Sequence, residues 1–229
     1  MLKLEKCRIT NGGFDLVADL TILRGARVAV IGPSGAGKTT LIEAIAGFLP
    51  LTQGKLLWEG QDLTDMPPGK RPIAMLFQDG NLFPHLSVAQ NVGLGIRANL
   101  RLDAQQQAQV ERALDRVGLA GLGGRKPAAL SGGQQSRVAL ARVLVQGRDL
   151  LLLDEPFAAL GPALKAEMLD LVAELAGETG ATVLMVSHDP RDAEELAEEV
   201  ILVADGQAFA PRKTSELFAA PPEALKAYL

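Results

Sequence analysis

The chain has 229 residues, 48% hydrophobic and 22% charged, which is enough for one large domain or for one domain with a subdomain. Its net charge of −4 argues against bulk binding to nucleic acid, and we find neither a long apolar run nor a signal peptide. The single cysteine, Cys7, excludes an intrachain disulfide and a cysteine metal cluster, so we expect a small buried residue on an early strand. These features predict a cytosolic protein that reaches a membrane only through a partner.

The beginning of the chain reads as strands joined by turns. The sequence Asn11-Gly12-Gly13 predicts a hairpin between strands at 4–9 and 14–23. Residues 28–31 predict a strand that is apolar on both faces, as in the middle of a parallel sheet covered by helices.

A phosphate-binding loop follows this strand and leads into a predicted helix at 38–48. The match to G-x-x-x-x-G-K-[ST] has the strand-loop-helix setting that the motif requires. Backbone N–H groups of such a loop and of the helix N-terminus face anionic oxygens, a lysine reaches the outer phosphates, and a hydroxyl is placed to bind Mg²⁺. The residues predicted to bind nucleotide here are Gly32, Pro33, Ser34, Gly35, Ala36, Gly37, Lys38, Thr39 and Thr40, with Lys38 also catalytic and Thr39 also a metal ligand.

A small antiparallel section and a second buried strand come next. Turns at 52–54 and 58–60 delimit the antiparallel section, in which we expect Trp58 to serve packing. After the breaker cluster 66–69, residues 73–77 predict a buried strand that ends at Gln78.

Residues 87–147 predict a helical subdomain inserted into an α/β core made of 1–86 and 148–229. Most of 87–146 reads as helix, with capping-box spacing at 87–90 and 103–106 and glycines after the second helix.

The rest of the chain alternates strands with helices, which predicts a mostly parallel, helix-covered sheet of the P-loop NTPase (RecA-like) type. The predicted strands are 150–153, 182–186 and 200–203, the predicted helices begin at Gly161-Pro162 and span 191–199, and the tail 213–229 reads as short helices broken by Pro221-Pro222.

Polar residues stand just past the carboxyl ends of three predicted strands, the edge at which open α/β sheets bind ligands. Asp154 follows four leucines, a pattern typical of a Mg²⁺-binding carboxylate, and Glu155 is free to orient or deprotonate an attacking water unless it is a plain surface acid. Gln78 could bind the metal or position water. For His188 the residues alone leave a structural and a functional role equally open.

A second anion site is predicted at Ser131, Gly132, Gly133 and Gln134, where a serine cap and two small residues begin a helix. One nucleotide has one terminal phosphate, and the loop at 32–39 already covers it. We therefore expect this second site to serve the nucleotide bound to another copy of the chain.

With these motifs in this order, the chain resembles the ATP-binding cassette (ABC) ATPases over its whole length. The resemblance implies a head-to-tail dimer that sandwiches two ATP molecules between the phosphate loop of one copy and the segment 130–134 of the other. It implies that Glu155 is the general base, that His188 contacts the γ-phosphate, and that the helical subdomain and the region of Gln78 grip an integral membrane permease.

Within that family the chain is most similar to the ATPase subunits of bacterial thiamine importers. Such a protein would lie on the cytoplasmic face of the inner membrane and act with a periplasmic or surface solute-binding protein through the permease. The similar stretches are 46–49, 71–72, 75–78, 81–83, 85–86, 88–91, 93–95, 185–188 and 203–206.

Other functions stay open at this point. They include importers of another solute such as iron or molybdate, exporters or lipoprotein-release systems, ABC-type ATPases acting on DNA, and non-hydrolysing nucleotide sensors. The negative charge and the lack of long coiled-coil arms disfavour the DNA-acting class, and the presence of Glu155 disfavours the sensor.

The chain departs from the family pattern at two places. The aromatic residue that usually stacks on adenine is replaced by Asn11, with Phe14 the nearest candidate. The loop before the helix at 162 ends in Gly161 rather than aspartate. Glycine still caps a helix at a cost of about a few tenths of a kcal/mol, so we expect hydrolysis to persist with altered coupling between the two sites.

Overall fold

The structure is a computed structural model that describes residues 1–78 and 80–226. In this part of the chain eleven strands form one sheet in the order β5-β4-β1-β2-β10-β9-β3-β8-β7-β6, with β11 paired to β9. The strands are β1 (Leu2–Asn11), β2 (Phe14–Ile22), β3 (Arg27–Ile31), β4 (Gln53–Trp58), β5 (Gln61–Asp62), β6 (Ile73–Leu76), β7 (Leu150–Asp154), β8 (Thr182–Val186), β9 (Glu199–Ala204), β10 (Gln207–Ala208) and β11 (Arg212–Lys213).

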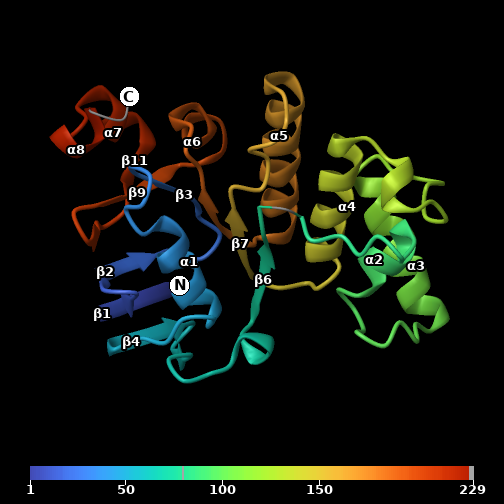
Figure 1. The fold of residues 1–229 in the computed structure, drawn as a ribbon, viewed down its shortest axis with the longest axis horizontal. Coiled ribbons are helices and arrows are strands. Elements are labelled where there is room, and N and C mark those ends of the chain that lie inside the picture. Colours follow the sequence, from blue (N-terminus) through green and yellow to red (C-terminus); the bar gives the residue numbers. More distant parts are fainter. Residues whose placement is uncertain (79, 227–229) are drawn as a thin grey trace.

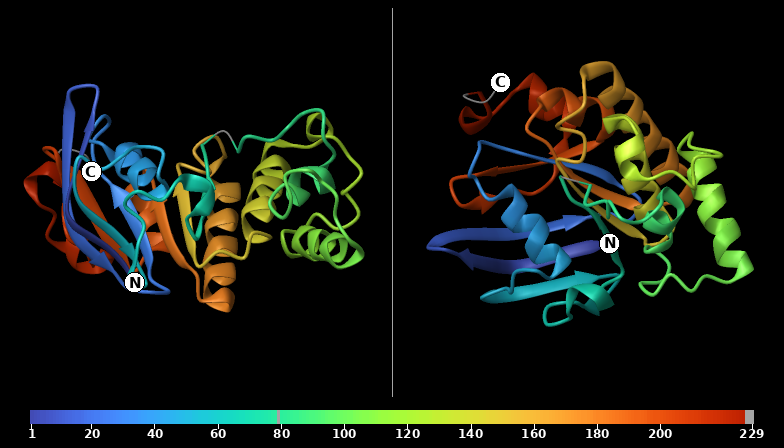
Figure 2. Two further views of the ribbon diagram at one scale, coloured as in Figure 1. Left: turned by 90° about the horizontal axis from the view of Figure 1, so that it is seen from below. Right: turned by 45° about the vertical axis from the view of Figure 1, so that its right-hand side comes forward.

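The helices cover both faces of this sheet and form a separate group at one end of the molecule (Figures 1 and 2). The α-helices are α1 (Lys38–Ala46), α2 (Val88–Gly93), α3 (Ala104–Arg116), α4 (Gly132–Leu144), α5 (Pro162–Thr179), α6 (Pro190–Leu196), α7 (Thr214–Ala219) and α8 (Glu223–Lys226), and the 3₁₀ helices are η1 (Pro68–Lys70) and η2 (Pro127–Ala129). None of the helices in the described residues is long and apolar enough to cross a membrane.

The sheet has two sections that the sequence pattern distinguishes. β9, β3, β8, β7 and β6 are parallel neighbours, and their residues are almost all buried because helices lie on both faces. β1, β2, β4 and β5 pair antiparallel, as the turn signals predicted. The glycine turn at 12–13 joins β1 to β2 with both residues at positive φ. The predicted mostly parallel P-loop NTPase sheet with a small antiparallel section is confirmed.

Alternate residues of β7 show how the core divides. Leu150 and Leu152 pack with α1 and the antiparallel section, whereas Leu151 and Leu153 pack with α4 and α5 on the opposite face. A third cluster places α6, α7 and α8 against β3 and β9. Buried apolar surface thus fixes α1, and the loop before it, at the carboxyl edge of the parallel strands.

The helical group α2–α4 has its own apolar cluster, which contains Val88, Val92, Leu114 and Val138. Figure 2 shows this group projecting from the end of the sheet. The capping boxes predicted at Ser87 and at Asp103 are present. We propose 87–147 as the boundaries of a helical subdomain.

Several predicted boundaries are wrong by a few residues. The first helix ends at Ala46 because Gly47 takes a left-handed conformation with φ 91°. The strand predicted at 73–77 ends at Leu76. The helix predicted at 191–199 ends at Leu196, because Glu199 pairs with Val28 as the first residue of β9.

The helical region also contains less helix than the sequence suggested. Residues 94–103 connect α2 to α3 through turns rather than continuing a helix, whereas α3 ends at Arg116, just before Gly118, as the glycines after this helix predicted. The predicted tail helices are present as α7 and α8 on either side of Pro221-Pro222, while the part of that prediction at 227–229 lies outside the described residues.

Two packing predictions made for single residues are confirmed. Trp58 is buried at the end of β4, and Cys7 is fully buried on β1. The Cys7 thiol donates to the Lys55 carbonyl oxygen over 3.1 Å, and its burial raises the pKa of the thiol to about 11. A thiol with this pKa is inert, as expected of a packing residue.

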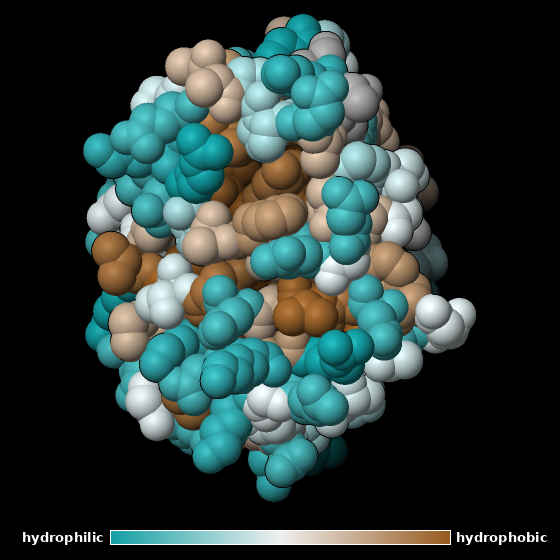
Figure 3. Space-filling view, turned by 90° about the vertical axis from the view of Figure 1, so that its left-hand side faces the viewer, coloured by the Kyte–Doolittle hydropathy of each residue, from teal (hydrophilic) through white to brown (hydrophobic). Residues whose placement is uncertain are grey.

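The face formed by the hairpin and the C-terminal helices is mostly hydrophilic. Figure 3 shows hydrophobic side chains gathered in a hollow near its middle. The exposed large apolar residues of the described chain include Leu23, Phe48 and Phe83.

Gly32 marks the closest approach between the phosphate loop and the sheet. A Cβ atom at Gly32 would lie 2.0 Å from the backbone oxygen of Val203 on the neighbouring strand β9, and φ is +152°. Backbone atoms cannot move aside as a flexible side chain can, so we expect Gly32→Ala to destabilise the protein by about 3 kcal/mol. Chemical denaturation measures this change. Gly69→Ala is the matched control, because a Cβ there meets open space at an ordinary φ; equal stability of the two variants would contradict the prediction.

Candidate functional site

The phosphate loop lies between the end of β3 and the start of α1, as the sequence predicted. It borders an open cleft of about 350 Å³. Residues lining the cleft come from the hairpin, the loop, α1 and the end of β7, namely Asn11, Phe14, Ser34, Gly35, Gly37, Lys38, Thr39, Thr40 and Glu155.

The remaining predicted loop residues, Gly32, Pro33 and Ala36, do not line the cleft but hold the loop in place. Gly32 is buried beside β9, and Ala36 packs against the main core cluster. The carbonyl oxygens of Gly32 and Pro33 accept hydrogen bonds from Lys38 Nζ, over 2.8 and 3.0 Å. These two bonds use two of the three donors of the ammonium group and hold it at the base of the loop.

The start of α1 favours an anion. Its N-cap, Gly37, has a left-handed conformation and no side chain to cap the helix, and the first turn carries no acidic residue. The first N–H groups of the helix, at the positive end of its dipole, therefore have no side-chain partner and are available to an anionic ligand. Lys38 adds a buried positive charge, although burial lowers the pKa of its ammonium group while Glu155 and Asp154 act to raise it.

Asp154 and Thr39 bring two oxygen donors together. Asp154 is the last residue of β7, and the Thr39 hydroxyl donates to its Oδ1 over 3.5 Å. Burial, followed by the charges of Glu155 and Glu43, raises the pKa of the Asp154 carboxyl. A carboxylate in these surroundings is stabilised by a nearby cation, and hard divalent cations prefer such oxygen ligands.

Glu155 and His188 meet although they are far apart in the sequence. His188 Nδ1 lies 3.1 Å from Glu155 Oε2. An ionised carboxylate can only accept, so Nδ1–H is the donor. Glu155 has φ 43°, and its N–H donates to the Val186 oxygen at the end of β8. This left-handed turn directs the carboxylate of Glu155 toward both the cleft and His188.

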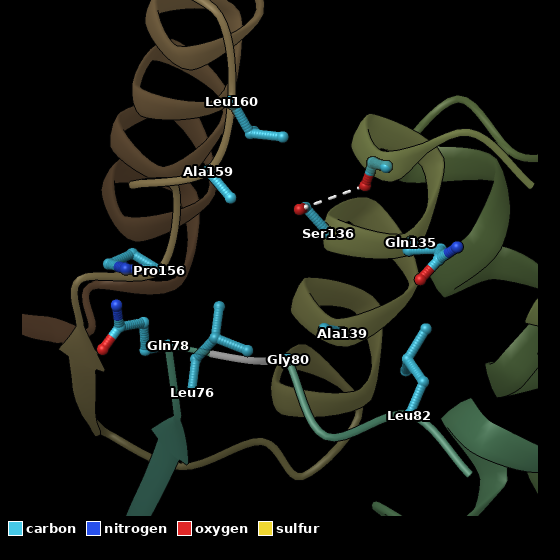
Figure 4. A pocket seen from close by; sticks show the side chains of 11 residues that line it. Leu76, Gln78, Gly80, Leu82, Gln135, Ser136, Ala139, Pro156, Ala159 and Leu160 are labelled. Atoms are coloured by element: carbon cyan, nitrogen blue, oxygen red, sulfur yellow. Dashed lines mark hydrogen bonds between the residues drawn. The ribbon is translucent and has the colours of Figure 1, made fainter. Parts of the chain in front are cut away.

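Gln78 lies in a different place from the phosphate loop. It borders a second cavity, of about 260 Å³, between the sheet and α4. In Figure 4, Gln78 lies just past the end of β6 and near Pro156, while Ser136 and Ala139 lie across the cavity on α4. The metal-binding and catalytic roles of Gln78 stay predictions.

The segment 131–134 begins α4, as predicted, but does not line the cleft of its own chain. Ser131 and Gln134 form a capping box: the Gln134 N–H donates to Ser131 Oγ and the Ser131 N–H to Gln134 Oε1. A Cβ at Gly133 would lie 2.2 Å from Leu164 of α5, so glycine lets the two helices approach, while Gly132 is exposed.

The structure shows where the two departures from the family pattern, Asn11 and Gly161, lie. Asn11 and Phe14 face each other across the hairpin, and both line the cleft. The Phe14 ring lies against Gly37, where an added Cβ would be 2.7 Å from it. We propose that Phe14 is the residue that contacts adenine. Gly161 is the N-cap of α5 without a side-chain cap.

Comparison with known proteins agrees with this geometry. A profile of the ABC transporter family matches residues 17–158. The chain is 63% identical over its whole length to the thiamine import ATP-binding protein ThiQ of Ruegeria sp. (strain TM1040), covering 99% of that protein. It is 50% identical over 217 residues to the ThiQ protein of Escherichia coli (strain K12), covering 95% of this chain and 94% of that protein.

A solved structure shares the fold. The dimeric post-hydrolysis structure of the ATP-binding cassette MJ0796 bound to ADP and phosphate superimposes with a TM-score of 0.80 at 29% identity, over 93% of this chain and 99% of that one. The motifs, the sheet and these similarities have one reading: the chain belongs to the ABC transporter family.

Proposed function

We propose that this protein is the ATP-hydrolysing subunit of an importer for thiamine and thiamine phosphates. The observation that supports thiamine as the solute is the similarity to proteins named for thiamine import, 63% identical over the whole chain and 50% identical over 217 residues. The observation that carries the ATPase activity is the cleft, in which Lys38, Thr39 and Glu155 meet at the N-terminus of α1.

The oxygen atoms of Thr39 and Asp154 fit a Mg²⁺ ion, and we assign the ion to them. Gln78, which lines the neighbouring cavity in this structure, stays a predicted further ligand. The two oxygen atoms lie 3.5 Å apart, and burial and the neighbouring acids raise the pKa of Asp154, so a cation bound between them would stabilise its carboxylate. When bound, Mg²⁺ supplies charge neutralisation to the β- and γ-phosphate oxygens.

The chain's own residues account for the phosphoryl transfer. The N–H groups of the loop and of α1 hold the phosphate oxygens, and Lys38 turns from the carbonyls of Gly32 and Pro33 to the terminal phosphate. Glu155 accepts the proton of the attacking water. His188, placed by its hydrogen bond to Glu155, contacts the γ-phosphate.

The segment Ser131, Gly132, Gly133 and Gln134 acts on the nucleotide of a second copy. The reason is its position: it begins α4, away from the cleft in its own chain, and offers a helix N-terminus to an anion. The dimeric structure of MJ0796 supports the pairing of two copies, which we propose to be head to tail. A site completed only when two copies close couples hydrolysis to motion.

The partners follow from the importer role. We propose an integral membrane permease, a solute-binding protein that acts through it, and a peripheral location on the cytoplasmic face of the inner membrane. We propose no nucleic-acid partner, given the net charge of −4.

The direct test is ATPase activity of the transporter assembled in lipid with its permease and binding protein. We expect thiamine with the binding protein to stimulate hydrolysis several-fold, and iron or molybdate to leave it unchanged. Stimulation by another solute alone would contradict thiamine as the solute and leave the ATPase assignment standing. Absence of turnover under every condition would contradict the ATPase assignment.

A further inference from the structure

A group of buried ion pairs braces the loop that carries His188. Lys165, on the first turns of α5, places Nζ 2.6 Å from Asp192 Oδ1 and 3.3 Å from Asp189 Oδ2. The three side chains are only 15%, 9% and 20% exposed. Lys165 therefore links α5 both to the residue after His188 and to α6.

Ser187 completes the brace on the other side of His188. Its hydroxyl donates to the Asp192 carboxylate and accepts from the Asp189 N–H over 3.0 Å. The Ser187 N–H in turn donates to the Val30 oxygen at the end of β3. Both neighbours of His188 are thus anchored, Ser187 to the sheet and Asp189 to α5.

The same lysine also lies at the end of the loop that begins with Glu155. This loop runs from Glu155 to Gly161, and the Lys165 N–H donates to the Gly161 oxygen over 3.0 Å in the first turn of α5. The start of the loop, the end of β8 and His188 line a common cavity of only about 10 Å³. These links form a closed ring. The loop 155–161 connects Glu155 to α5, Lys165 of α5 pairs with Asp189, and His188, the residue before Asp189, bonds Glu155.

The energetics make Lys165 the critical member of this ring. Burial alone would lower the pKa of Lys165, but hydrogen bonds and charges from Asp192 and Asp189 raise it. Asp189 has a pKa of about 2, held down first by Arg191 and then by Lys165. Removing the lysine charge would leave Asp192 buried beside Ser187 without its cation, and the loop would have to move to hydrate it.

We propose that Lys165 is a positioning residue that holds His188 in hydrogen-bond reach of Glu155. The proposal rests on the proposed ATPase function for its kinetic consequence, but its structural part stands on the brace alone. Lys165 is not among the residues that line the cleft, so it acts through the 187–189 loop rather than on the nucleotide.

The first test reads the histidine directly. The chain has two histidines, His85 and His188, so their ring signals in a ¹H–¹³C NMR spectrum of the full chain are assigned by one variant, His188→Ala. We expect Lys165→Met to shift and broaden the His188 signal and to leave the His85 signal unchanged. Lys165→Arg, which keeps the positive charge, should restore the wild-type His188 signal. Glu178→Gln, which breaks the ion pair of α5 with Arg116 at its other end, is the control and should move neither signal.

A second variant guards against misfolding of Lys165→Met. The pair Lys165→Met with Asp192→Asn removes both charges and leaves no unpaired buried ion, a change that proteins tolerate better than loss of one partner. It should shift the His188 signal as well. An unmoved His188 signal in either folded variant would overturn the proposal.

The second test is kinetic. Lys165→Met should lower kcat for ATP about tenfold with little change in KM. The reason is that a small displacement of His188 impairs the chemical step without removing a contact that binds ATP in the ground state. In a His188→Ala background the same substitution should change single-turnover hydrolysis less than twofold. An equal tenfold loss in both backgrounds would show a role independent of His188 and overturn the proposal. A wild-type chain without turnover would contradict the ATPase assignment instead, and the NMR result would still decide the brace.

Discussion

Glu155→Gln should abolish turnover and trap an ATP-bound dimer. Glutamine has nearly the same shape and can still accept from His188 Nδ1, so the contact of 3.1 Å is kept while the base is lost. General-base catalysis contributes about 10²- to 10⁴-fold, so we expect hydrolysis to fall at least about 100-fold. With ATP bound but not cleaved, the closed pair should accumulate and elute earlier from a sizing column in the presence of Mg²⁺.

The matched control for this experiment is Glu178→Gln, an isosteric change at an exposed acid of α5. It should hydrolyse ATP normally and should not accumulate as a dimer. If Glu155→Gln stays monomeric with ATP and Mg²⁺, the segment 131–134 does not act on a second copy and the shared-site proposal is wrong.

Lys38→Ala should have the other large effect. The substitution removes the one buried positive charge at the base of the loop and both of its hydrogen bonds to the carbonyls of Gly32 and Pro33. Loss of one preorganised electrostatic partner of a transition state costs about 10²- to 10³-fold in rate, so turnover and any transport it powers should fall by at least about 100-fold.

The control for Lys38→Ala is Lys70→Ala, which removes an exposed lysine at the end of η1. Both variants should unfold at denaturant concentrations close to wild type: Lys70 is exposed, and the Lys38 ammonium group bonds carbonyl oxygens rather than a carboxylate while burial opposes its charge. Full activity of Lys38→Ala would contradict the assignment of the phosphate loop.

Much of this molecule could be predicted from its sequence because the signals are local. The loop at 32–39, the capping boxes at 87 and 103 and the uniformly apolar strands each depend on neighbours a few residues away. The glycine turn of the first hairpin is a signal of the same kind. These elements lie where the pattern indicated.

The errors occurred where tertiary pairing decides the outcome. Glu199 belongs to β9 because it pairs with β3, and the acidic pattern before it gave no sign of that. The connection at 94–103 replaces predicted helix because α2, α3 and α4 pack against one another as a compact group.

The site shows the same division. Sequence order placed Lys38, Asp154, Glu155 and His188 near one edge of the sheet, but only the structure reveals the contact between Glu155 and His188. The brace formed by Lys165 and Asp192 was missed altogether, since Asp192 stands in a run that reads as a solvated acidic helix. Its one sequence signal is the closeness of Ser187, Asp189 and Asp192.

The measurement that tests the central claim most directly is uptake of labelled thiamine by cells of the native organism, comparing wild type with Lys38→Ala at the chromosomal locus and with Lys70→Ala as control. The account predicts that high-affinity uptake is lost in the first variant and kept in the second. Unchanged uptake in Lys38→Ala, with the protein still expressed and associated with the membrane, would contradict thiamine as the solute, and the permease that co-purifies with the chain would then identify the transporter.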